Sequence, residues 1–255
     1  MPRALIAGNW KMHKTVAETV DFVRGLKQRL SGVSDRDVLV APPFTSLHAA
    51  VMEARGSSIG IAAQNMHWEA KGAYTGEISA GMLTDAGCTH VIIGHSERRR
   101  LFGETDDQIN LKIMAGLQAG LKIIFCIGET LEEREAQQTF TVIKTQLNQG
   151  LKNIPMGDIS RVSVAYEPVW AIGTGKTATP GQAEDAHAFI RTELGRMYPG
   201  QSAAETCILY GGSVTPENIK GLMAEPDVNG ALVGGASLDL ESFLKIIRFE
   251  FKQRF

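Results

Sequence analysis

The chain has 255 residues, of which 44% are hydrophobic and 21% charged, and its formal net charge is -2; this is an ordinary composition for a soluble globular protein. The near-neutral charge argues against nucleic acid as a partner, and no apolar run approaches the roughly 18 residues of a membrane span. The length fits two average domains or one α/β barrel of about 250 residues.

Short apolar runs alternate with amphipathic helical patterns along the whole chain. The runs are apolar on both faces, which is typical of strands in a buried parallel sheet. The predicted strands are Ala4–Trp10, Asp37–Ala41, Ile59–Gln64, His90–Gly94, Leu121–Ile127, Arg161–Glu167, Thr206–Tyr210 and Gly230–Val233.

Helical patterns lie between these strands. Thr15 and Glu18 have the spacing of a capping box at the start of the first helix. The apolar stripe predicted for that helix is Val16, Val20, Val23, Leu26 and Leu30. Thr179 and Pro180 indicate the N-cap and first position of a later helix. The last helix carries Phe243, Leu244, Ile246, Ile247 and Phe249.

About eight strand–helix units follow one another without a linker or a change in composition. Repeated units of this kind indicate a parallel sheet. In a chain of this length, about eight of them favour closure over an open doubly wound sheet. The sequence therefore predicts one domain over residues 1–255: an α/β fold that is a closed (β/α)8 barrel, with eight parallel strands and an outer ring of helices.

The three cysteines are Cys88, Cys126 and Cys207, and no two of them form a CxxC pair. They indicate reduced thiols in a cytoplasmic protein, and neither a disulfide framework nor a metal site. We expect Cys126 to be a packing residue, because a thiol nucleophile needs an activating base. The initial MPRALIAGNW has too short an apolar run for a secretory signal.

Chemistry in such a barrel lies in the loops that follow the strands. The residues at the ends of the predicted strands or directly after them are Asn9, Trp10, Lys11, His95, Glu167, Gly211, Gly212, Ser213, Gly234, Gly235, Ala236 and Ser237. A carboxylate, a histidine, a lysine and an amide indicate proton transfer. The two Gly/Ser loops allow backbone N–H groups to approach a phosphate. Together they predict proton transfer on a small phosphorylated substrate.

Each of these residues also has a structural interpretation. A single histidine at a strand end is more often structural than catalytic, although Glu167 and Lys11 beside it reverse that preference. Glu167 could cap a helix, but Pro168 and the apolar residues after it do not fit a helix start. The arginines of the GHSERRR run are expected to brace a loop through ion pairs; they are Arg98, Arg99 and Arg100, with Glu104, Asp106 or Asp107 as partners.

Several motifs carry a resemblance to a known family. They are AGNWKMH, AQNMHWEAKGAYTGEIS, IGHSERR, CIGET, AYEPVWAIGTGKTATP, YGGSV and LVGGASL, in this order. With them the chain closely resembles the triosephosphate isomerase family, essentially from end to end. The resemblance implies a TIM-barrel isomerase that interconverts dihydroxyacetone phosphate and D-glyceraldehyde 3-phosphate through an enediol(ate), in glycolysis and gluconeogenesis. It implies no metal and no organic cofactor.

The resemblance also implies roles for individual residues. Glu167 is the base, and His95 is the neutral electrophile that polarises the carbonyl. Lys11 and Asn9 hold the substrate and the enediolate, and Glu97 positions Lys11. The backbone groups that hold the phosphate are those of Gly173, Ser213, Gly234 and Gly235.

The segment after Glu167 is predicted to be a lid. Pro168, Val169 and Trp170 form a stiff first hinge, because proline fixes φ. Ile172 lies at the tip as an apolar cover over the base, and Lys176–Ala178 is the second hinge. Closure would exclude water and bring the Gly173 N–H to the phosphate.

The third strand's loop predicts a subunit interface. Its residues Met66, His67, Trp68, Tyr74 and Thr75 are large or apolar for an exposed loop. A two-fold homodimer is the default closed assembly. The resemblance implies the same, with Thr75 reaching a neighbouring subunit near Asn9 and His95.

Two other functions stay open from the residues alone. A phosphate-binding aldolase or epimerase would share the barrel, and an aldolase would need a Schiff-base lysine, for which Lys176 is the available residue. A non-catalytic scaffold would keep the fold, but every matched catalytic position carries a competent residue.

Overall fold

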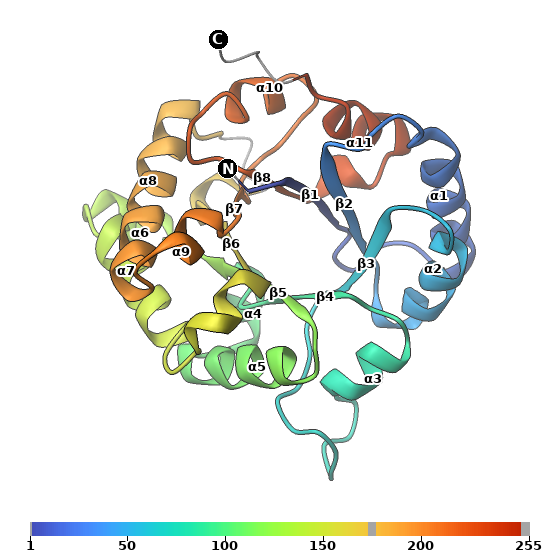
Figure 1. The fold of residues 1–255 in the computed structure, drawn as a ribbon, viewed down its shortest axis with the longest axis horizontal. Coiled ribbons are helices and arrows are strands. Elements are labelled where there is room, and N and C mark those ends of the chain that lie inside the picture. Colours follow the sequence, from blue (N-terminus) through green and yellow to red (C-terminus); the bar gives the residue numbers. More distant parts are fainter. Residues whose placement is uncertain (1, 173–176, 251–255) are drawn as a thin grey trace.

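The fold is a closed barrel of parallel strands surrounded by helices (Figure 1). The computed structural model describes residues 2–172 and 177–250. In this part of the chain the eight strands are β1 (Ala4–Asn9), β2 (Arg36–Ala41), β3 (Ile59–Ala63), β4 (His90–Ile93), β5 (Lys122–Ile127), β6 (Val162–Tyr166), β7 (Ile208–Tyr210) and β8 (Gly230–Val233). Each pairs in parallel with the next, and β8 pairs with β1. The predicted fold class is confirmed.

All eight predicted strands are present, and no end differs from its prediction by more than two residues. Their burial on both faces has a simple cause. Alternate residues such as Leu5, Leu39 and Ile124 fill the inside of the barrel, whereas Ile6, Val38 and others pack outward against the helices. Because side chains fill the interior, a site built from the barrel strands can form only at their ends.

The outer ring consists of helices that follow the strands in chain order (Figure 1). Among the described residues they are α1 (Val16–Arg29), α2 (Leu47–Ala54), α3 (Ala80–Asp85), α4 (Ser96–Phe102), α5 (Asp106–Gln118), α6 (Leu131–Glu135), α7 (Thr139–Gly150), α8 (Pro180–Met197), α9 (Gln201–Glu205), α10 (Ile219–Leu222) and α11 (Leu240–Ile247). Short 3₁₀ segments are η1 (Phe44–Ser46), η2 (Met156–Arg161), η3 (Val169–Ala171) and η4 (Gly235–Ser237). None of the helices described is long and apolar enough to span a bilayer.

The predicted helix caps are present. Thr15 and Glu18 form a reciprocal capping box on α1, and Thr179 caps α8 with Pro180 in its first turn. The stripe predicted for α1 is wrong at its start, because Val16 is 45% exposed. Thr19 and Phe22 are buried instead, and the Phe22 ring meets Trp10 edge-on with 4.9 Å between the ring centroids.

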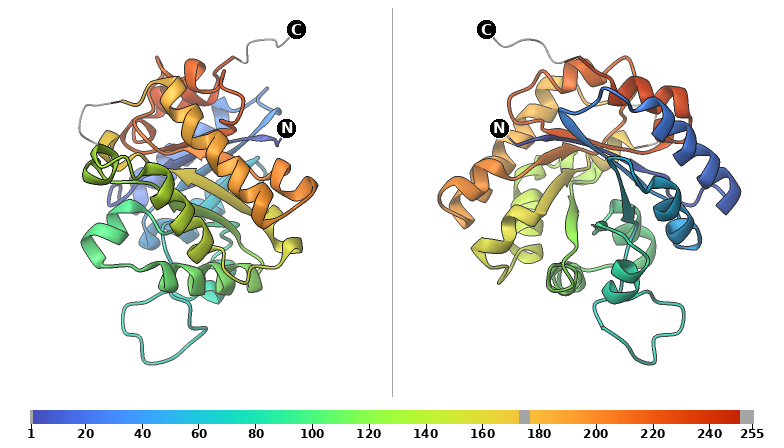
Figure 2. Two further views of the ribbon diagram at one scale, coloured as in Figure 1. Left: turned by 90° about the vertical axis from the view of Figure 1, so that its left-hand side faces the viewer. Right: turned by 45° about the vertical axis from the view of Figure 1, so that its right-hand side comes forward.

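The segment between β3 and α3 extends away from the barrel (Figure 2). The prediction that its large residues are exposed is wrong for Met66, which is fully buried in the core, and for His67, which is 9% exposed. The His67 ring packs on Trp68 and Tyr74, with centroid distances of 4.1 and 4.4 Å. Tyr74, at 44% exposure, and Thr75 face solvent.

Candidate active site

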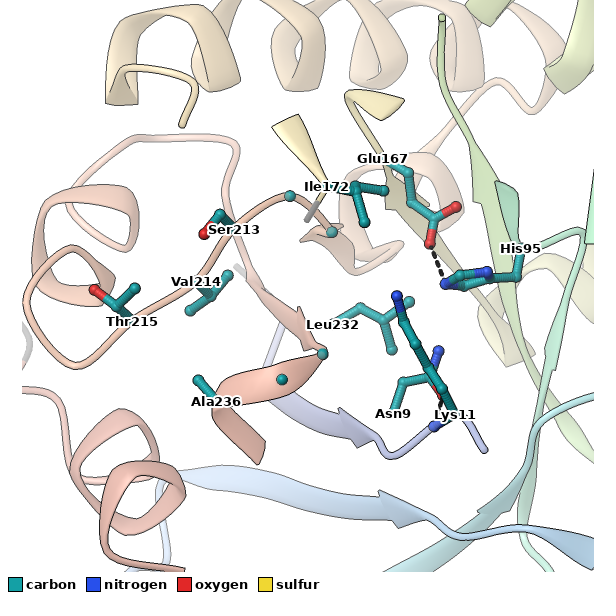
Figure 3. Close-up of a pocket in the computed structure, with 14 residues that line it drawn as sticks. Asn9, Lys11, His95, Glu167, Ile172, Ser213, Val214, Thr215, Leu232 and Ala236 are labelled. Atoms are coloured by element: carbon teal, nitrogen blue, oxygen red, sulfur yellow. Dashed lines mark hydrogen bonds and ion pairs between the residues drawn. The ribbon is translucent and has the colours of Figure 1, made fainter. Parts of the chain in front are cut away.

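A cavity of about 290 Å³ lies at the carboxyl ends of β1, β4, β6, β7 and β8 (Figure 3). Its lining residues are Asn9, Lys11, His95, Glu167, Ile172, Gly211, Gly212, Ser213, Val214, Thr215, Leu232, Gly234, Gly235 and Ala236. Every predicted site residue is among them except Glu97, which lies beside Lys11, and Gly173, which lies outside the described residues. The fold therefore brings together groups that are up to 226 positions apart in sequence, from Asn9 to Gly235.

Glu167 follows the last residue of β6 and is 1% exposed. Its Oε2 accepts a hydrogen bond from the Ser96 N–H at 2.8 Å. Its Oε1 lies 3.1 Å from His95 Nε2, the contact drawn in Figure 3. The carboxylate is thus held at the edge of the cavity, with one hydrogen-bonding partner at each of its oxygens.

His95 is the N-cap of α4, and this position assigns its tautomer. Its Nδ1 accepts the backbone N–H of Glu97 at 3.2 Å, while the Glu97 carboxylate is farther away, at 3.7 Å. A ring nitrogen that accepts a hydrogen bond carries no proton, so in the neutral ring the proton lies on Nε2. His95 therefore presents an N–H donor to the cavity and to Glu167.

Lys11 is held in an uncommon backbone conformation. Its φ is 52°, in the left-handed region that non-glycine residues rarely occupy. Asn9 Oδ1 accepts the Lys11 N–H at 3.0 Å, and Gln64 Nε2 donates to the carbonyls of Lys11 and Ala41, each at 2.8 Å. No role for Gln64 could be predicted from the sequence, because its partners are backbone carbonyls of distant segments.

The Lys11 ammonium pairs with Glu97, with 2.6 Å between Nζ and Oε1. Partial burial acts to raise the pKa of Glu97. The hydrogen bond from Lys11 and the positive charges nearby outweigh that effect and leave the pKa below its ordinary value. Glu97 is therefore a carboxylate at neutral pH, and it fixes the ammonium at the cavity wall.

The loops after β7 and β8 line the opposite wall of the cavity (Figure 3). The carbonyl of Ser213 accepts from the Asn218 amide at 2.9 Å, and that of Gly234 accepts from the Ser237 hydroxyl at 2.7 Å. Among the described residues, no acceptor is found for the N–H groups of Ser213, Gly234 and Gly235. Free backbone N–H groups at one wall are the feature that binds phosphate.

The first hinge of the predicted lid is anchored by Glu129, a fully buried carboxylate. Its Oε1 accepts from Trp170 Nε1 at 2.9 Å, Tyr166 Oη at 3.1 Å and Arg134 Nη1 at 3.2 Å. Its carbonyl accepts the Val169 N–H at 3.0 Å. The sequence showed Glu129 only as part of CIGET, since its three donors lie on separate segments.

Gly128 is required by the close approach of the Glu167 backbone. A Cβ atom at residue 128 would lie 1.8 Å from the carbonyl oxygen of Glu167. Gly128→Ala is therefore expected to lower the free energy of unfolding by about 1–3 kcal/mol, as overpacking does, and to displace Glu167. Urea unfolding and steady-state kinetics measure the two effects.

Gly195→Ala is the matched control for Gly128→Ala. Gly195 lies in α8, and an added Cβ would meet no atom within 4 Å. It is expected to raise stability by about 1 kcal/mol, because alanine is the better helix former. Equal changes in the free energy of unfolding for the two substitutions would contradict the steric argument.

The comparisons with known proteins identify one family. The family model described as "Triosephosphate isomerase" matches residues 4–250. A triosephosphate isomerase of Geotalea uraniireducens is 54% identical over 249 residues, covering 98% of this chain and 99% of the relative. That of Moorella thermoacetica is 55% identical over 250 residues, covering 98% and 100%.

A solved structure of the same family has the same overall fold. The crystal structure of triosephosphate isomerase from Bartonella henselae superposes with a TM-score of 0.88 at 39% sequence identity, covering 96% of this chain and 97% of that one. The chain belongs to the triosephosphate isomerase family.

Proposed function

We propose that this chain interconverts dihydroxyacetone phosphate and D-glyceraldehyde 3-phosphate by moving a proton between adjacent carbons. The observation that carries the proposal is one cavity with a buried carboxylate, a histidine N–H donor and a paired lysine on one side. Across from them lie the backbone N–H groups of Ser213, Gly234 and Gly235, for which the described part of the chain offers no acceptor. This arrangement suits a three-carbon substrate with a phosphate at one end.

Glu167 is the base in this proposal. A C–H beside a carbonyl is a weak acid, so the base has to lie close to the carbon, and the oxygen has to be stabilised as it gains charge. Substrate entering the cavity would replace the contact with His95 Nε2, and Glu167 could then take the proton from one carbon and return it to the next. One mobile base is sufficient, because both carbons lie within its reach.

His95, Lys11 and Asn9 act on the substrate oxygens. The Nε2–H of His95 donates to the carbonyl oxygen and to the enediolate that follows. The Lys11 ammonium supplies positive charge at the same wall, and Glu97 holds it there. Donors that are already oriented before the reaction stabilise the developing charge with little reorganisation.

Ser213, Gly234 and Gly235 hold the phosphate through backbone N–H groups, and Gly173 adds a further N–H from the lid. Lid closure about Pro168–Trp170 covers the base with Ile172, which lines the cavity next to Glu167 (Figure 3). Excluding water strengthens the electrostatic interactions inside and protects the enediolate from losing phosphate.

A coupled assay on the purified protein tests the function directly. We expect turnover in both directions without added metal or organic cofactor, and no turnover with either triose phosphate would refute the proposal. The aldolase alternative is tested by borohydride. A trapped substrate adduct would favour it, whereas the isomerase forms no Schiff base.

The working unit in this proposal is a cytoplasmic homodimer formed through the loop that carries Thr75. Support comes from the way this loop extends from the barrel (Figure 2) and from the exposed side chains of Tyr74, Met82 and Phe102. An extended loop with apolar neighbours favours association with a second copy.

Sedimentation is expected to give a particle of twice the chain mass of 27.6 kDa. Thr75→Arg is expected to shift the protein toward the monomer and to lower kcat at least about tenfold, since a charge of this size is costly in an interface core. Thr192→Arg, on the exposed face of α8, is the control. A fully active monomer would refute the role of Thr75 in a neighbouring site.

A further inference from the structure

The three consecutive arginines of α4 have different surroundings. Arg98 Nε pairs with Glu104 at 3.3 Å, and Arg99 Nη1 pairs with Asp106 at 2.6 Å. The loop-bracing interpretation is confirmed for these two. It is wrong for Arg100, which is exposed and whose guanidinium, within residues 2–172 and 177–250, has no ion-pair or hydrogen-bond partner.

Arg100 lies beside the ion pair of Lys11 and Glu97. It is three residues after Glu97 on α4, so the two side chains share one face of the helix. With Lys11, Ser96 and Glu97 it lines a cavity of about 110 Å³ that also touches Val169 and Ile172 of the lid. It also lines a second cavity, of about 300 Å³, which Glu167 lines as well.

The charges in this region explain what an unpaired arginine can contribute. Lys11 and Glu97 form a close pair with no net charge, so Glu97 cancels much of the positive charge that the enediolate needs. Arg100 is one of the groups whose positive charge acts on the Glu97 carboxylate. The other charged groups that line the two cavities are Arg99, which Asp106 already neutralises, and the carboxylates Glu133 and Glu167.

We infer that Arg100 is a positioning residue for the isomerisation and that it acts through Glu97. Its guanidinium offsets the charge of Glu97, so that the cluster of Lys11, Glu97 and Arg100 presents a net positive charge to the reacting carbons. The inference rests on the proposed function. A substrate phosphate brings roughly two negative charges, and the enediolate adds a third close to Lys11.

Arg100→Gln tests this, because glutamine is polar but uncharged. Relative to the unmodified protein, kcat/KM is expected to fall about two- to fivefold at about 10 mM ionic strength, the size of one charge acting across roughly 10 Å of partly hydrated protein. The difference should vanish near 0.5 M NaCl, where the screening length is only a few ångströms. Arg100→Lys should restore the rate.

Two comparisons separate this effect from a general loss of charge. Arg24→Gln removes a positive charge from α1, where Arg24 pairs with Asp21 and Glu53, and it should leave kcat/KM unchanged at both salt concentrations. The inhibition constant of glycerol 3-phosphate, which has the phosphate but forms no enediolate, should change less than kcat/KM.

The outcomes are distinct. If kcat/KM of Arg100→Gln equals that of the unmodified protein at low salt, the inference is wrong. A loss that persists at high salt and in Arg100→Lys would show a structural role instead, and would also overturn it. Absence of turnover in the unmodified protein would overturn the proposed function itself, and this inference with it.

Discussion

Glu167→Asp is expected to lower kcat about a hundredfold or more, since a displacement of about 1 Å at a reacting group is enough for a loss of this size. The substitution keeps the charge and shortens the side chain by one methylene. The native carboxylate spans two contacts, to the Ser96 N–H at 2.8 Å and to His95 Nε2 at 3.1 Å. An aspartate cannot keep both positions and also reach a carbon in the cavity. Steady-state kinetics in both directions measure the effect.

The expected loss concerns chemistry, so KM should change much less than kcat. Glu135→Asp, on an exposed position of α6, is the matched control and should leave kcat unchanged. The unfolding transition of Glu167→Asp should stay within about 1 kcal/mol of the unmodified protein, because charge and most packing are retained. A normal kcat would remove Glu167 from the mechanism.

The barrel could be predicted from the sequence because its strands carry a strong local pattern. Runs such as Leu121–Ile127 are apolar on both faces, and only a sheet covered on both sides buries them. The caps at Thr15 and Thr179 are local as well. The error at Val16 has a different origin: the buried face of α1 is set by its contact with Trp10 at the end of β1, and no pattern within the helix contains that information.

The position of the candidate site could be predicted for the same reason. Once eight parallel strands close, residues that follow the strands must meet at one end, and seven of the nine predicted site residues line one cavity. What the sequence missed are residues that act through backbone groups or distant partners. Gln64 donates hydrogen bonds to two backbone carbonyls. Gly128 leaves space for the Glu167 carbonyl, and Glu129 accepts hydrogen bonds from donors on separate segments.

Two misjudged residues show the limit of reading residue type alone. Met66 is a large apolar residue in a loop, which indicated an exposed interface, but it is buried in the core. Arg100 looks identical to Arg98 and Arg99 in sequence, and each arginine has acidic residues within reach along the chain. The helix directs only two of them to those partners, so the third became informative only with the structure.

Lys11→Met is expected to lower kcat by about 10² to 10³, the usual effect of removing one group that stabilises a developing oxyanion. Methionine is unbranched like lysine but has no charge. Asn9 Oδ1 and Gln64 Nε2 form hydrogen bonds with the backbone of residue 11 and not with its side chain. The loop should therefore keep its conformation. Steady-state kinetics measure the loss, and circular dichroism checks the fold.

Part of that loss should come from Glu97 and not from the missing ammonium. Lys11 and Glu97 are 2.6 Å apart at the wall of the site, and removing the cation leaves a carboxylate facing an enediolate of the same sign. Adding Glu97→Gln to Lys11→Met should therefore recover about tenfold in kcat, within the range of coupling between neighbouring residues.

Glu97→Gln alone should have the opposite effect on kcat and slow the reaction, because Lys11 loses the partner that fixes its ammonium. The same substitution would then be harmful with Lys11 present and beneficial without it, and only a charge pair at the reacting centre predicts that reversal. Additive losses in the double variant would show that Glu97 acts independently of Lys11.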